Sequence, residues 1–141
     1  MKAISQEGND LLWKENTDPD LKKDEVLIRI KASAINRADL LQRSGNYPVP
    51  PGASTILGLE CAGIVEEVDG QVKNFKKGDE VCALLAGGGY AEKVSVPSGQ
   101  VLKIPNGFSF EQAAALPEVF ATAYFNPVSY THLTLTTTPY V

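Results

Sequence analysis

Short β-prone segments, separated at short intervals by turn residues, most limit the folds open to this chain. Residues 25–31 alternate apolar and polar side chains, the period of a half-buried strand. Further strands are predicted at 57–68, 81–85, 91–96 and 101–104. Gly58 and Gly63 interrupt the first of these, where the strand must bend or another backbone must approach closely. Many short strands with few helices indicate a mainly β fold with short helices, a small barrel or sandwich.

Two helices are predicted. The first covers residues 36–43, with Asn36 as its N-cap and Gly45 at its end. The second begins at Ser109, which forms a capping-box pattern with Gln112, and Pro117 is expected to end or kink it. Between them, residues 47–52 contain three prolines, which predict an extended surface loop.

The three consecutive glycines at 87–89 invite a phosphate-binding interpretation, which their context excludes. A P-loop needs Gly-Lys-Ser/Thr, and a dinucleotide fingerprint starting at Gly87 needs a glycine where Glu92 stands. A glycine-rich hairpin turn between the strands at 81–85 and 91–96 is the better prediction. The chain also lacks a Gly-x-Ser-x-Gly nucleophile elbow. The residues alone therefore indicate a domain without a catalytic group of its own.

Size and charge exclude several classes of partner. The 141 residues suffice for one core but not for two domains of about 100–150 residues each. Seventeen acidic against 13 basic residues argue against nucleic acid, and no apolar run approaches the ~20 residues that span a membrane. Residues 1–7 do not resemble a secretory signal, so we expect a cytoplasmic protein. Cys61 and Cys82 are then expected to be small buried hydrophobes and not a disulfide.

The end of the chain differs in composition from the rest. Residues 119–141 contain no Asp, Glu, Lys or Arg, and five of the eight threonines lie within 131–138. The β-prone segment 127–141 resembles translated adapter sequence and lacks charged residues that limit aggregation. We therefore expect residues 1–126 to be the native domain and 127–141 to be foreign. His132, the single histidine, is interpreted as incidental, since its segment contains no Cys, Asp or Glu.

Several spaced motifs resemble the N-terminal part of the medium-chain dehydrogenase/reductase superfamily, and most nearly its quinone oxidoreductase branch of the tumour-suppressor-inducible type. In order, these motifs are ASAINRADL at 32–40, GNYP at 45–48, PPG at 50–52, LGLECAGIV at 57–65, FKKGDEV at 75–81, GGGYAE at 87–92, VLKIP at 101–105, AAALP at 113–117 and TAY at 122–124. The resemblance covers residues 1–126.

This resemblance implies a GroES-like, partly open β-barrel that forms the N-terminal domain of an α/β two-domain reductase. The implied reaction is hydride transfer from NADPH to a small-molecule quinone, with the protein supplying orientation. Zinc-dependent members have a cysteine where Asn36 stands and a histidine where Leu59 stands, and a four-cysteine lobe between Val81 and Glu92. Although Glu60 remains, the resemblance therefore implies the zinc-independent branch, with no metal site.

By the same resemblance, Asn36 and Tyr47 are the candidate catalytic residues. Asn36 and Thr122 would hydrogen-bond near the nicotinamide, and Tyr47 would flank the quinone. A related bacterial type has a second tyrosine where Leu41 stands. The simpler interpretations are a helix cap for Asn36, a loop anchor for Tyr47 and an ordinary helix residue for Thr122.

Two function classes stay open at this point. In the first, the chain is a fragment of a reductase whose pyrophosphate-binding turn would lie beyond Asn126, so residues 1–141 alone are expected to be inactive. The resemblance allows a homodimeric parent. In the second, the chain is a non-catalytic GroES-like interaction module.

Overall fold

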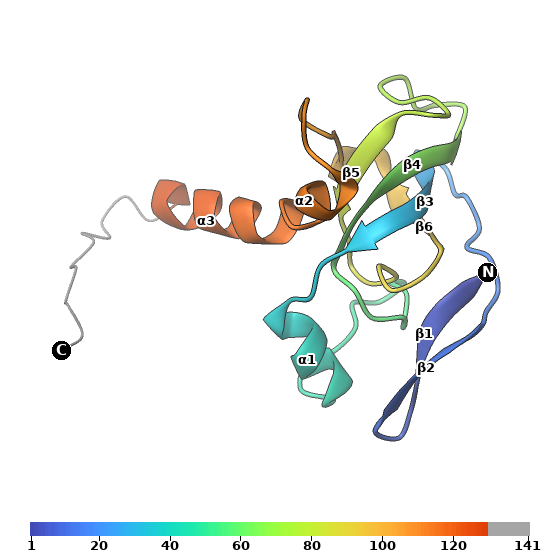
Figure 1. The fold of residues 1–141 in the computed structure, drawn as a ribbon, viewed down its shortest axis with the longest axis vertical. Helices are drawn as coiled ribbons and strands as arrows, with labels where there is room; N and C mark the ends of the chain where they lie inside the picture. The colour runs from blue at the N-terminus through green and yellow to red at the C-terminus, as the bar shows by residue number, and fades with distance from the viewer. Residues whose placement is uncertain (130–141) are drawn as a thin grey trace.

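The fold is mainly β, as predicted, and the computed structural model describes residues 1–129 (Figure 1). Strands β1 (Lys2–Glu7) and β2 (Asp10–Glu15) form an antiparallel hairpin that the sequence did not reveal. The main sheet has five antiparallel strands in the order β6-β3-β4-β5-β7. These strands are β3 (Glu25–Ser33), β4 (Glu60–Val68), β5 (Glu80–Leu84), β6 (Lys93–Pro97) and β7 (Val101–Lys103).

Irregular pairing between β3 and β4 curls this sheet into a half-barrel. The register shifts between Leu27 and Ile28 and again between Ile30 and Ala32. Gly63 lies in β4 between these shifts, and a Cβ atom there would stand 2.1 Å from the carbonyl oxygen of Arg29. The expected close backbone approach at Gly63 is confirmed, and only glycine fits this position without moving β3.

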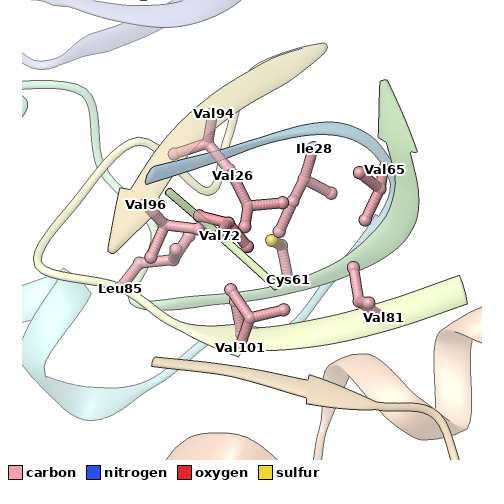
Figure 2. Packing of buried hydrophobic residues seen from close by; sticks show 11 residues of the cluster. Val26, Ile28, Cys61, Val65, Val72, Val81, Leu85, Val94, Val96 and Val101 are labelled. Carbon is pink, nitrogen blue, oxygen red and sulfur yellow. The ribbon is translucent and has the colours of Figure 1, made fainter. Parts of the chain in front are cut away.

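Two hydrophobic clusters lie on opposite faces of the sheet. The interior cluster, most of which is labelled in Figure 2, consists of Val26, Ile28, Cys61, Val65, Val72, Val81, Ala83, Leu85, Val94, Val96 and Val101. On the other face, Ala62 and Cys82 pack against the helix that begins at Phe110. Because Cys61 and Cys82 face opposite sides, they are free buried thiols, as expected, and burial raises the pKa of both.

The helices confirm the start signals in the sequence. Helix α1 (Arg37–Arg43) has Asn36 as its N-cap residue and Gly45, with φ +76°, beyond its end. Helix α2 (Phe110–Ala114) has the predicted capping box of Ser109 and Gln112. A 3-10 turn η1 (Ser98–Gln100) precedes β7.

Pro117 has a further role that the sequence prediction missed. Helix α2 ends before it, as expected, but Pro117 is also the first residue of α3 (Pro117–Ser129). Proline is well suited to this position, because the first N–H of a helix has no partner within the helix. Helix α3 projects away from the sheet (Figure 1).

Two strand predictions were wrong in detail. The glycines at 87–89 do not form a hairpin turn, since β5 pairs with β4 and β7 whereas β6 pairs with β3. They pass instead alongside the segment before β4, where the Gly88 N–H donates to the Ile56 carbonyl at 2.7 Å. The predicted strand at 57–68 begins only at Glu60, because Gly58 has φ +106° and leaves the extended conformation.

The segment predicted to be foreign, 127–141, lies mostly outside the described residues. Helix α3 continues through Ser129, three residues into that segment, and His132 lies outside the described part. Among residues 1–129, no helix is long and apolar enough to cross a membrane.

Candidate functional site

Asn36 lies where the chain leaves β3 and enters α1. Its extended backbone (φ −115°, ψ 156°) is typical of an N-cap, and its N–H donates to Oδ2 of Asp39 at 2.8 Å. Its side-chain amide also has a distant partner, because Nδ2 donates to Oε1 of Glu60 at 2.7 Å. Asn36 is therefore a helix N-cap residue whose side chain is hydrogen-bonded to Glu60 of β4.

Glu60 is the partner that joins Asn36 to the rest of the site. It is the first residue of β4, and only 1% of it is exposed. Its second oxygen, Oε2, accepts a hydrogen bond from the N–H of Glu118 at 2.9 Å. Glu118 is the second residue of α3, so the carboxylate lies at the positive end of that helix. One buried carboxylate thus connects the start of α1 with the start of α3.

A second buried carboxylate, Asp39, supports the same end of α1. It is 2% exposed, and its Oδ1 accepts from the N–H of Gly58 at 3.2 Å. Besides the Asn36 N–H, its Oδ2 accepts from the hydroxyl of Tyr90 at 2.8 Å. Burial, reinforced by the hydrogen bond to Asp39, raises the pKa of Tyr90. The neutral hydroxyl therefore remains a donor to Asp39.

Tyr47 and Thr122 are more exposed than these buried groups. Tyr47, 38% exposed, lies in the loop after α1, and Thr122 lies on α3 one turn beyond Glu118. Glu60 connects the elements that carry Asn36 and Thr122. No hydrogen bond within the described residues links Tyr47 to either of them.

The surface beside Asn36 is apolar and open. Ile35 is 78% exposed, and Leu40 and Leu41 on α1 are also exposed. A hollow of about 540 Å³ elsewhere on the molecule is lined by residues such as Asp18, Pro50 and Gly87, and by none of the candidate site residues. The apolar side chains beside Asn36 are therefore exposed on the surface of the described residues.

Sequence reasoning missed the roles of Glu60, Asp39 and Tyr90. One signal was present for Glu60, because it is the only charged residue in the run LGLECAGIV at 57–65. A charged side chain in a buried strand must find partners, so this pattern indicates a polar network. Nothing comparable marks Tyr90, whose partner Asp39 lies 51 positions away in the chain.

Comparison with known proteins relates this chain to oxidoreductases. The alcohol dehydrogenase GroES-like domain family matches residues 22–106. A synaptic vesicle membrane protein VAT-1 homolog from Danio rerio is 41% identical over 115 residues, covering 82% of this chain and 24% of that protein. A 2-methylene-furan-3-one reductase from Solanum lycopersicum is 40% identical over 120 residues, covering 75% of this chain and 30% of that protein.

Solved structures agree with this relationship. The quinone oxidoreductase from Thermus thermophilus, solved also in complex with NADPH, superimposes with a TM-score of 0.75 at 35% identity. That match covers 94% of this chain and 42% of the Thermus protein. The chain thus spans only about a quarter to two fifths of the length of these relatives. By its sequence match and its fold, this chain belongs to the alcohol dehydrogenase GroES-like domain family of the medium-chain dehydrogenase/reductase superfamily.

Proposed function

We propose that this chain is the substrate-side domain of an NADPH-dependent quinone oxidoreductase of the tumour-suppressor-inducible, zinc-independent type. The observation that carries the proposal is the Asn36 amide, held by the buried Glu60 beside an exposed apolar surface. The likeness of the chain to the Thermus quinone oxidoreductase, 35% identical and solved with NADPH, supports the same conclusion. The proposal keeps a cytoplasmic location and a small-molecule quinone as partner.

The polar groups present suit a nicotinamide. When bound, NADPH would supply the hydride that reduces the quinone. Asn36 and Thr122 offer an amide and a hydroxyl, which can donate to and accept from the uncharged carboxamide of the nicotinamide. Tyr47 would flank the quinone, and the exposed side chains of Ile35 and Leu40 would give its ring an apolar surface. The protein's part is to orient the two reactants.

The chemistry of the side chains also supports a zinc-independent reaction. Leu59 has no donor atom, and Nδ2 of Asn36 is already hydrogen-bonded to Glu60. Within residues 1–129, no three His, Cys, Asp or Glu side chains gather as a metal-binding group. Zinc sites in proteins are built from such ligands.

The test is NADPH oxidation by the full-length protein that carries this chain, with 1,4-benzoquinone as acceptor. Asn36→Ala should lower kcat/KM about tenfold, the value of one hydrogen bond of about 1.4 kcal/mol. Asn74→Ala, at an exposed position away from the site, is the matched control. A chelator should leave the rate unchanged, and residues 1–141 alone should not turn over. Absence of turnover by the full-length protein, or its loss on chelation, contradicts the proposal.

A second candidate function is a non-catalytic interaction module. It is favoured by the 41% identical Danio rerio relative, whose name refers to a vesicle membrane and not to a reaction. The two candidates differ in one measurement, because a binding module would neither bind nor oxidise NADPH.

A further inference from the structure

We infer that Glu60 is a positioning residue with two contacts. It fixes the orientation of the Asn36 side-chain amide, and it holds the first turn of α3, the helix that carries Thr122. The inference rests on the proposed function, because the orientation of Asn36 matters to the reaction only if this side chain contacts the cofactor. Glu60 would then determine whether Asn36 offers Oδ1 or Nδ2 to the cofactor.

The geometry places Glu60 between two hydrogen-bond donors, one from the N-cap of α1 and one from the first turn of α3. Oε1 accepts from the Asn36 amide at 2.7 Å, and Oε2 accepts from the Glu118 backbone N–H at 2.9 Å. Glu60 is 1% exposed, so water cannot readily replace either partner. A buried carboxylate that loses a partner is strongly unfavourable, which keeps both contacts in place.

The two contacts also fix which edge of the Asn36 amide faces Glu60. An asparagine side chain has a donating edge, Nδ2, and an accepting edge, Oδ1, and the two can exchange by a rotation of 180°. A carboxylate oxygen only accepts, so Glu60 requires Nδ2 of Asn36 to face it and turns Oδ1 away. The Glu118 N–H belongs to the backbone and cannot be reversed. Both oxygens of Glu60 must therefore be acceptors.

Glu60→Gln tests this requirement with little change in size. Glutamine has one oxygen and one NH₂ group, so it cannot accept from both partners. The fixed Glu118 N–H retains the glutamine oxygen, and the glutamine NH₂ group then faces Asn36. The Asn36 amide must turn by 180° to accept from it. This substitution therefore reverses the polarity that Asn36 offers to a ligand, without altering Asn36 itself.

The first experiment needs no cofactor. In the ¹⁵N-labelled 141-residue chain, the Asn36 side-chain amide is assigned by its loss in Asn36→Ser, which keeps an N-cap residue. We expect one Nδ2 proton to be shifted downfield and protected from exchange by the bond to Glu60. Glu60→Gln should remove that signature. Glu67→Gln, the same change at an exposed position of β4, should keep it. An ordinary, unprotected Asn36 amide in the unsubstituted chain overturns the inference, even if Glu60→Gln does not fold.

The second experiment uses the full-length protein with NADPH and 1,4-benzoquinone. Glu60→Gln should raise the KM for NADPH about tenfold and leave the KM for the quinone unchanged, whereas Glu60→Asp, which keeps two acceptors, should lie closer to the unsubstituted protein. An unchanged KM for NADPH in Glu60→Gln overturns the inference. If the unsubstituted protein does not oxidise NADPH, the proposed function fails, whereas the amide signal still reports on Glu60 separately.

Discussion

Removal of the Asp39 carboxylate should destabilise this domain far more than removal of the hydroxyl that donates to it. Asp39 accepts hydrogen bonds from the Asn36 N–H, the Gly58 N–H and the Tyr90 hydroxyl, at 2.8, 3.2 and 2.8 Å. Asp39→Ala leaves all three donors without this acceptor. Tyr90→Phe removes one donor but leaves each oxygen of Asp39 with a backbone N–H.

The magnitudes follow from this difference. A buried polar group left without a partner costs about 1–3 kcal/mol. Asp39→Ala leaves the Asn36 and Gly58 N–H groups in that state, whereas the Tyr90 hydroxyl keeps the Ala34 carbonyl at 3.3 Å, so the total should be about 3–5 kcal/mol. That is a large part of the roughly 5–15 kcal/mol by which a typical domain is stable. Losing the Tyr90 hydroxyl should cost about 1.5 kcal/mol, because one hydrogen bond to a charged group disappears and no oxygen of Asp39 becomes unpaired.

The assay is urea unfolding of both variants and of the double variant. The two effects should not add, because both include the same hydrogen bond, and the coupling energy should be about 1–2 kcal/mol. Tyr47→Phe, at a more exposed tyrosine, is the control and should change the free energy of unfolding by no more than about 0.5 kcal/mol. Additive effects, or an Asp39→Ala cost no greater than that of Tyr90→Phe, would refute this account of the network.

Two further predictions concern the sheet. Gly63→Ala would place a Cβ 2.1 Å from the Arg29 carbonyl oxygen, and we expect the free energy of unfolding in urea to fall by about 3 kcal/mol or more. Gly70→Ala, where nothing lies within 4 Å of the added Cβ, is the control and should have a mild effect. Burial raises the pKa of the Cys61 thiol from 9.0 to about 12, so the folded state keeps the thiol proton at pH values at which the unfolded state has lost it. The free energy of unfolding should therefore fall as pH rises from 9 towards 12, by up to about 1.4 kcal/mol per pH unit. Cys61→Ala should flatten this slope under reducing conditions, and equal slopes would contradict it.

Features that depend on neighbours in sequence could be predicted. The N-caps Asn36 and Ser109 and the apolar alternation of β3 each rest on contacts within a few residues. Gly63 in a strand predicted either a bend or a close backbone approach, and the structure has the close approach. The partner of that approach, Arg29, could not be predicted.

Features that depend on distant pairing could not be predicted. The glycines at 87–89 favour a local hairpin, but β6 pairs with β3, which lies much earlier in the chain, and not with β5. The candidate site shows the same limit. Asn36 was identified through family resemblance, whereas its partner Glu60 lies 24 positions away and Glu60 in turn binds Glu118, 58 positions further along the chain. Such a connection depends on the tertiary arrangement and leaves no periodic signal.

The bond between Glu60 and the start of α3 has a mechanical consequence. Helix α3 extends away from the sheet (Figure 1). Its first turn is hydrogen-bonded to the same carboxylate that accepts from the Asn36 amide. A tilt of α3 about that turn changes the distance from the Glu118 N–H to Glu60, and Glu60 must then shift or lose a hydrogen bond. A shift of Glu60 also moves Oε1, which accepts from Nδ2 of Asn36 at 2.7 Å. The angle of α3 and the orientation of the Asn36 amide, which lies between β3 and α1, are therefore coupled through Glu60.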